Sequence, residues 1–199
     1  MVTLLLAGIA QAETRVVAFG DSLTAGFGLP KEEGFVPQLE NWLQQQGAHV
    51  VVVNAGVSGD TTAGGLSRVD WVLAEGADLV ILELGANDML RGVSPDVARQ
   101  NLDAILADIG GRGIKVLIAG MRAPPNYGAE YRAAFDSIYP ELAEKYNAEL
   151  YPFFLAGLGE ASGVAELFSL MQPDGMHPNA KGVELIVADI GPVVLDALQ

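Results

Sequence analysis

RVVAFGDSL, at Arg15–Leu23, is a run of apolar and β-branched residues that ends in a glycine and passes into a polar turn. Such a run predicts a buried strand that ends at Gly20. The run is continuously apolar rather than alternating, which is typical of a parallel sheet covered on both faces. Ligands of such sheets bind beyond the carboxyl ends of the strands, so Asp21 and Ser22 stand where chemistry is expected.

Four more runs of the same kind predict the other strands of the sheet. They lie at His49–Asn54, Asp78–Leu84, Lys115–Gly120 and Glu149–Phe154, the last of them weakened by a proline. Predicted helices lie at Phe35–Gln46, Ala98–Ile109, Ala129–Tyr146 and Val183–Leu198. We expect Pro140 to bend or break the third helix and Pro192 to kink the fourth. This alternation predicts one α/β domain, residues 13–199, with a parallel sheet and right-handed crossovers.

The composition of the chain excludes several classes of protein. Its 199 residues include no cysteine and only two histidines, His49 and His177. The lack of cysteine excludes disulfides, a thiolate nucleophile and cysteine-ligated metals. Asp and Glu outnumber Lys and Arg by 25 to 11, for a formal net charge of −14. This charge argues against nucleic acids and anionic membranes as partners.

The first twelve residues, MVTLLLAGIAQA, are uncharged and end in the small-x-small pattern Ala10-Gln11-Ala12. They resemble the apolar region and cleavage site of a secretory signal peptide, although no basic residue precedes them. We therefore interpret residues 1–12 as a signal-peptide remnant and expect a periplasmic or secreted protein. The alternative is an ordinary buried N-terminal segment. We expect no stable membrane insertion, because a span needs about 20 apolar residues.

Polar, glycine-containing clusters follow four of the predicted strands. They lie at Gly20–Leu23, Asn54–Asp60, Gly85–Asp88 and, beyond a long loop after the fifth strand, Asp174–Pro178. Because the carboxyl ends of parallel strands share one edge of the sheet, we expect the four clusters to meet there.

A histidine and a carboxylate in the last cluster have the spacing of a general base and its orienting partner. Asp174 lies three residues before His177, so its carboxylate can reach Nδ1 and fix the tautomer in which Nε2 accepts a proton. Ser22 is the candidate nucleophile, although no G-x-S-x-G pattern surrounds it, which disfavours the usual α/β-hydrolase. Donors for an oxyanion are the backbone N–H groups of Ser22 and Gly59 and the side-chain amide of Asn87.

The aspartates of the four clusters allow another interpretation. Carboxylates at Asp21, Asp60, Asp88 and Asp174 are ligands of the type that Mg²⁺ prefers. A magnesium site explains the aspartates but not the serine, histidine and asparagine beside them. The G-x-G-x-x-G and P-loop patterns of nucleotide-binding proteins are absent from the sequence. The magnesium site therefore stays the less favoured interpretation of these clusters.

Taken together, the four clusters resemble the sequence blocks of the SGNH, or GDSL, hydrolase superfamily. The matches are GDSL at Gly20–Leu23, SGDT at Ser58–Thr61, GAND at Gly85–Asp88 and DGMHP at Asp174–Pro178. The resemblance is closest to the branch of bacterial periplasmic thioesterase I/protease I/lysophospholipases and arylesterases. It rests there on LRG at Leu90–Gly92, PPNYG at Pro124–Gly128 and IYPELA at Ile138–Ala143. Ala86 departs from that branch, in which a glycine is common.

The resemblance implies a flavodoxin-like three-layer α/β/α sandwich with a five-stranded parallel sheet. It also implies a serine hydrolase that cleaves carboxylic ester and thioester bonds through an acyl-enzyme on Ser22. His177 is then the base, Asp174 its orienting carboxylate, and Ser22, Gly59 and Asn87 form the oxyanion hole. No cofactor is required.

We expect small-molecule acyl esters or thioesters as substrates of a monomer or small homo-oligomer. The residues expected to bind substrate are Asp21, Leu23, Met89, Leu90 and Met176, with Phe27, Leu170 and Met171 as further apolar candidates. Two alternative functions are a carbohydrate O-acetyl esterase of the same superfamily and a non-catalytic lipid-binding module.

Overall fold

The computed structural model describes residues 13–159 and 164–199. The signal-peptide remnant expected at residues 1–12 lies outside the described residues. Within the two described ranges, no helix combines the length and the apolar character needed to cross a bilayer.

Five parallel strands form a single sheet, as the sequence predicts. They are β1 (Thr14–Gly20), β2 (Val50–Gly56), β3 (Leu79–Glu83), β4 (Lys115–Ala119) and β5 (Glu149–Tyr151). Their spatial order is β2-β1-β3-β4-β5, which is the order of flavodoxin-like sheets. The order reverses between β1 and β3, and binding sites of open α/β sheets lie at such a reversal.

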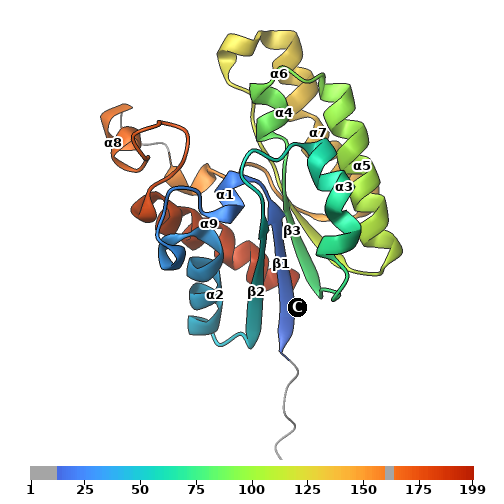
Figure 1. Ribbon diagram of the computed structural model, residues 1–199, viewed down its shortest axis with the longest axis vertical. Helices are drawn as coiled ribbons and strands as arrows, with labels where there is room; N and C mark the ends of the chain where they lie inside the picture. The colour runs from blue at the N-terminus through green and yellow to red at the C-terminus, as the bar shows by residue number, and fades with distance from the viewer. Residues whose placement is uncertain (1–12, 160–163) are drawn as a thin grey trace, which may run out of the picture.

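Helices cover both faces of this sheet and make it the middle layer of three (Figure 1). One face carries α2 (Phe35–Gln45) and α9 (Ala180–Ala197), which pack against each other. The other carries α3 (Thr62–Val72), α5 (Pro95–Gly111) and α7 (Ile138–Tyr146). Shorter helices are α1 (Ser22–Ala25), α4 (Ala86–Leu90), α6 (Ala129–Asp136) and α8 (Val164–Ser169). The expected three-layer α/β/α architecture is confirmed.

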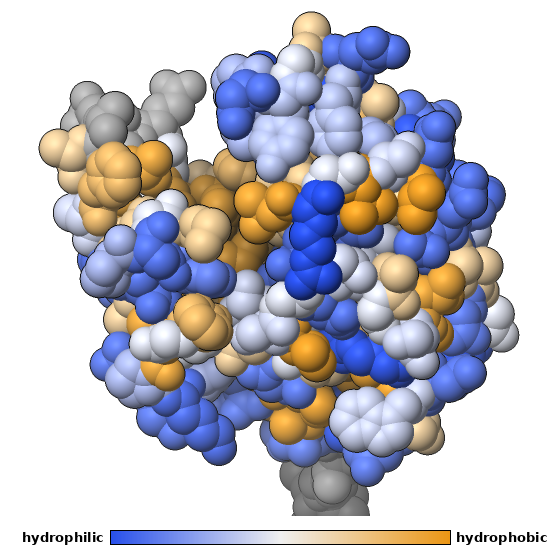
Figure 2. Space-filling model, turned by 45° about the horizontal axis from the view of Figure 1, so that its top comes forward, coloured by the Kyte–Doolittle hydropathy of each residue, from blue (hydrophilic) through white to orange (hydrophobic). Residues whose placement is uncertain are grey.

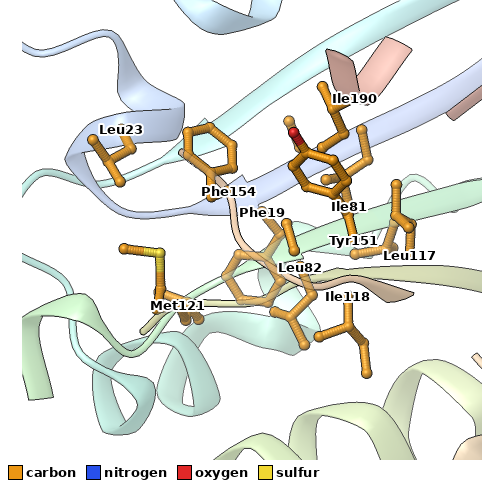
Figure 3. Packing of buried hydrophobic residues seen from close by; sticks show 14 of the residues in the cluster. Phe19, Leu23, Ile81, Leu82, Leu117, Ile118, Met121, Tyr151, Phe154 and Ile190 are labelled. Carbon is orange, nitrogen blue, oxygen red and sulfur yellow. The ribbon is translucent and has the colours of Figure 1, made fainter. Parts of the chain in front are cut away.

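The core lies on the two covered faces of the central strands. Every residue of β3 is buried, and so are the last five residues of β1. Figure 3 shows Phe19, Ile81 and Leu117, from three neighbouring strands, together with Phe154 and Ile190. Burying a large apolar side chain contributes roughly 1.5–3 kcal/mol, so these strands form a rigid base for the loops at their ends.

The strand register aligns the carboxyl ends of three neighbouring strands, β2, β1 and β3. Gly20, the last residue of β1, pairs with Gly56 in β2 on one side and with Glu83 in β3 on the other. Asp21 and Ser22 therefore leave the sheet beside the loops that follow the other two strands.

The structure differs from the predicted elements at the ends of two strands and in one long helix. β2 continues to Gly56, two residues beyond the predicted end, and β5 stops at Tyr151, before Pro152. Helix α3 was not predicted, because Gly64 and Gly65 in its first turn are poor helix formers. Its N-cap Thr61 accepts a hydrogen bond from the Gly64 N–H, which helps the helix to begin there.

The interruption predicted for the third helix lies close to the expected position. The helix expected to break near Pro140 is divided at Ser137, between α6 and α7. Pro140 is the third residue of α7, and N–H groups in a first helical turn have no partner in the helix, so proline is tolerated there. α9 begins at Ala180 and runs through Pro192 to Ala197.

Candidate active site

Ser22 stands at the start of a one-turn helix directly after β1. Asp21 caps that helix, since its Oδ1 accepts a hydrogen bond of 3.0 Å from the Leu23 N–H. Gly26 ends the helix in the left-handed conformation, with φ of 78°. The strand and its cap thus hold the serine at the edge of the sheet.

Ser22, His177 and Asp174 form a continuous hydrogen-bonded relay. Ser22 Oγ lies 2.9 Å from His177 Nε2, and His177 Nδ1 lies 2.7 Å from Asp174 Oδ2. The second oxygen, Asp174 Oδ1, accepts the backbone N–H groups of Met176 at 2.9 Å and His177 at 3.0 Å. The Met176 N–H contributes most, followed by the His177 ring, and together they lower the pKa of Asp174 to about 2. Asp174 is therefore a carboxylate whenever a neutral imidazole is present.

The loop that carries His177 is held at both ends. The Gln172 N–H donates to the His177 carbonyl at 2.7 Å, and Gln172 Nε2 donates to the Phe27 and Pro178 carbonyls at 2.8 and 3.0 Å. Asn179 caps α9, which begins directly after this loop. The Phe27 ring packs on the imidazole with 4.7 Å between centroids. These contacts fix the height and tilt of the imidazole over Ser22.

Gly59 and Asn87, the other residues predicted as oxyanion donors, line the same cavity as Ser22. Gly59 has φ of 81° in a turn closed by the Asp60 N–H on the Val57 carbonyl, a conformation that favours glycine. Its carbonyl accepts a 2.7 Å hydrogen bond from Arg91 Nη2. Asn87, on α4, donates from Nδ2 to Asp21 Oδ2 at 2.9 Å. An amide nitrogen carries two hydrogens, so the second can serve an oxyanion.

An apolar cavity of about 340 Å³ opens over these groups. All five residues predicted to bind substrate line it, and Phe27 does too, whereas Leu170 and Met171 do not belong to its lining. Figure 2 shows hydrophobic side chains gathered along a hollow in this face of the molecule. Ser22, Asn87 and His177 belong to the same lining, so apolar surface adjoins these polar groups.

The fold and this relay agree with the comparison to known proteins. The family model described as "GDSL-like Lipase/Acylhydrolase family" matches residues 18–185. The chain belongs to this family. The fold and the resemblance expected from the sequence are thereby confirmed.

Relatives of this GDSL-like hydrolase cover nearly its whole length. Esterase TesA of Pseudomonas aeruginosa is 40% identical over 191 residues, 96% of this chain and 92% of the relative. Thioesterase 1/protease 1/lysophospholipase L1 of Escherichia coli is 35% identical over 184 residues, 90% and 82% of the two chains. The crystal structure of AlinE4, an SGNH-hydrolase family esterase, is 48% identical, covers 95% of this chain and 98% of its own, and superposes with a TM-score of 0.77. The GDSL-like hydrolase is a carboxylic ester hydrolase.

The magnesium interpretation loses its basis because the four aspartates serve different partners. Asp60 forms an ion pair of 2.7 Å with Arg68, and Asp88 accepts hydrogen bonds from the Thr62 N–H and Oγ1 at 2.7 and 2.6 Å. Asp21 is engaged by Leu23 and Asn87, and Asp174 by the His177 loop. Among residues 13–159 and 164–199, no three His, Asp or Glu side chains are grouped as metal ligands would be.

The remaining wall of the cavity was not predicted. It is formed by Met121, Arg122, Pro124, Phe153 and Leu155. These residues follow β4 and β5, so the available signals were this position and, for Pro124, the PPNYG match. Glu83, the buried last residue of β3, was also missed, because it was counted as part of an apolar strand.

Proposed function

We propose that the GDSL-like hydrolase cleaves esters and thioesters of small acyl substrates through an acyl-enzyme on Ser22. The observation that carries this proposal is the 2.9 Å contact between Ser22 Oγ and His177 Nε2, with ionised Asp174 behind the imidazole. A serine whose proton faces an oriented base is the arrangement that nucleophilic catalysis requires.

In the proposed reaction, Ser22 Oγ attacks the carbonyl carbon while its proton passes to His177 Nε2. Asp174 stabilises the imidazolium that forms. The negative oxygen of the tetrahedral intermediate accepts hydrogen bonds from the N–H groups of Ser22 and Gly59 and from Asn87 Nδ2. Nε2 then gives the proton to the leaving oxygen or sulfur. Water repeats the sequence to release the acid and free Ser22.

The lining of the cavity supports an acyl chain as the group that is bound. Leu23, Met89 and Met121 offer apolar surface rather than the hydrogen-bonding groups that a sugar requires. This favours acyl esters over acetylated carbohydrates. The name of the Escherichia coli relative, which includes both a thioesterase and a lysophospholipase, supports the inclusion of thioesters. The relay of Ser22 and His177 supports catalysis over mere lipid binding.

The proposed location is the periplasm or the exterior of the cell. The support is the apolar run at residues 1–12 and its Ala10-Gln11-Ala12 ending. We propose a monomer or small homo-oligomer that acts on small molecules.

Replacement of the serine tests the proposal. With p-nitrophenyl acetate, butyrate and octanoate and with an acyl thioester, Ser22→Ala is expected to lose about 10³-fold or more in kcat, because the nucleophile is gone. Ser67→Ala is the matched control, since Ser67 is exposed on α3 and its Oγ bonds only the Gly64 carbonyl. A Ser22→Ala variant with an unchanged rate contradicts the acyl-enzyme. Faster turnover of an acetylated sugar than of any acyl ester contradicts the substrate class.

A further inference from the structure

Glu83 is a buried acidic side chain that the proposed reaction does not use. It is 0% exposed at the end of β3, beside Gly20, the last residue of β1. Its Oε2 accepts hydrogen bonds from the Asp21 N–H at 3.2 Å and from Thr24 Oγ1 at 2.9 Å. Its Oε1 is buried and receives no hydrogen bond from any described residue. A buried carboxylate oxygen that accepts no hydrogen bond is energetically costly, so the protonation state of Glu83 needs an explanation.

A second acidic side chain, Asp21, lies next to Glu83 and is 1% exposed. Its oxygens accept hydrogen bonds from the Leu23 N–H and from Asn87 Nδ2. Neither acid forms an ion pair with a lysine or arginine in the part of the chain that the structure describes. Two adjacent buried carboxyl groups without a cation cannot both ionise at low cost, so one of them holds a proton.

The surroundings of the two acids assign that proton to Glu83. Burial raises the pKa of Glu83 well above its usual value, and the charge of Asp21 raises it further. Burial also raises the pKa of Asp21, but the Leu23 N–H, the Asn87 amide, His177 and a hydrogen bond from Glu83 oppose that rise. Asp21 is bonded only by donors, as a carboxylate requires. Glu83 has one oxygen bonded by donors and one left over, as a protonated acid requires.

We propose that Glu83 is a positioning residue that keeps a proton on Oε1 and donates it in a hydrogen bond to the Asp21 carboxylate. Asp21, held in place by this hydrogen bond, orients the amide of Asn87 toward the oxyanion. The inference rests on the proposed function, since it gives Asn87 a place in the oxyanion hole. Glu83 touches no reacting atom and acts through Asp21 and Asn87.

Other ionisable groups lie around the pair. They are Tyr139 on α7, Arg68 on α3 and His177, and beyond Tyr139 lie Asp88 on α4 and Asp136 on α6. Burial raises the pKa of Tyr139 well above its usual value, so Tyr139 stays neutral at the pH of an assay. Asp88 accepts two hydrogen bonds from Thr62 and none from either member of the pair. Arg68 is the permanent cation among these groups, and it is engaged by Asp60 and by the Ala55 and Gly20 carbonyls rather than by either acid of the pair.

Glutamine has the shape of a glutamic acid that carries its proton on Oε1. In Glu83→Gln, the amide oxygen can accept from Asp21 and Thr24 while the amide nitrogen donates to the Asp21 carboxylate. We therefore expect kcat/KM within about threefold of wild type near neutral pH. Glu83→Ala removes the donor to Asp21 and is expected to lose about 10²-fold, the effect of a disturbed oxyanion donor. Thr62→Ser is a matched control, because it changes a buried side chain near Asp88 and leaves the pair intact.

The pH profile separates the proposed role from a merely structural one. As the pH rises, wild type loses the shared proton, and the second buried charge displaces Asp21 or Asn87, so kcat falls on the alkaline side. Glu83→Gln has no proton to lose and keeps its rate to a higher pH. A Glu83→Gln variant that is about 10²-fold slower near neutral pH overturns the proposal, because Glu83 then acts as an ion. Identical alkaline profiles of the two proteins overturn it as well.

Stability gives a readout that does not depend on activity. The folded-state pKa of Glu83 is raised, so its contribution to the free energy of unfolding is full below its unfolded value of about 4.3 and is lost as pH rises toward the folded value. Glu83→Gln does not lose this contribution. Its urea midpoint, relative to that of wild type, should therefore increase as the pH rises. A constant difference across the range contradicts a protonated Glu83. If Ser22→Ala is active, the proposed function itself has failed. If only the Glu83→Gln results disagree, this inference alone has failed.

Discussion

At the scale of the residue, Asp174 shows how three short hydrogen bonds prepare a side chain for one task. One oxygen is occupied by backbone N–H groups, and this leaves the other to face Nδ1 of His177. The same bonds hold the pKa of Asp174 at about 2. Its charge is therefore constant over the pH range of an esterase assay, and protonation of this acid does not shape the activity profile.

Asp174→Asn should reverse the tautomer of the base. The amide of the asparagine can donate to Nδ1, which leaves the proton of the imidazole on Nε2, where it cannot accept the proton of Ser22. We expect kcat to fall by about 10⁴-fold, as for an orienting aspartate in other serine hydrolases. Asp70→Asn, on the exposed side of α3, should keep the wild-type rate. A loss of less than about tenfold in Asp174→Asn contradicts its orienting role. Steady-state hydrolysis of p-nitrophenyl butyrate measures both variants.

At the scale of the element, Gly65 of α3 and Gly110 of α5 affect the stability of the protein in opposite ways. Gly110, in the last turn of α5, faces open space, and a Cβ there meets nothing within 4 Å. A Cβ on Gly65 of α3 would lie 2.4 Å from Leu84 Cδ1 and 3.5 Å from Ile105 Cδ1. Gly65 thus lets α3 pack closely on the sheet and on α5, while Gly110 only weakens its helix.

These two glycines allow a paired test of packing against helix propensity. Gly110→Ala should raise the free energy of unfolding by about 0.5–1 kcal/mol, because alanine loses less backbone entropy in a helix. Gly65→Ala should lower it by about 1–3 kcal/mol, because the methyl group overpacks the layer between α3 and β3. Urea denaturation followed by circular dichroism measures both. A shift of the same sign in both variants contradicts the close packing of α3.

At the scale of the whole molecule, the excess of acidic residues is the dominant electrostatic property. A formal net charge of −14 on 199 residues creates repulsion that compact folding increases. Ion pairs such as Arg68–Asp60 relieve it only locally. Salt screens charges beyond about 10 Å at 0.1 M, so it weakens this long-range repulsion more than the short contacts.

Salt should therefore stabilise the protein. Between about 0.01 and 0.15 M NaCl, the urea midpoint is expected to rise, because the screening length falls from about 30 to 8 Å. The double variant Glu32→Lys, Glu33→Lys changes two exposed residues before α2 and makes the net charge less negative, so its rise should be smaller. A midpoint that falls with salt in wild type, or rises equally in both proteins, shows that the acidic excess does not govern stability.

Much of the fold could be predicted because its signals are local. The apolar runs placed β1, β3 and β4 within one residue at each end, and the periodicity of Ala98–Ile109 placed the buried face of α5. Helix α3 escaped prediction because Gly64 and Gly65 are weak helix formers that packing retains. The break predicted near Pro140 lies three residues earlier, at Ser137, because a proline in the first turn of a helix is tolerated and the helix therefore begins before it.

The candidate site divides in the same way. Sequence alone was enough to select the candidate residues Ser22, Gly59, Asn87, Asp174 and His177. Each of them lies in a short polar cluster that follows a predicted strand, and such a cluster can be recognised from a few neighbouring residues. Folding had to supply the 2.9 Å approach of His177 to Ser22, which joins residues 155 positions apart. Folding also supplied the far wall of the cavity and the burial of Glu83 beside Asp21. Burial and proximity arise from contacts between segments that are distant in the sequence, and no local sequence pattern encodes such contacts.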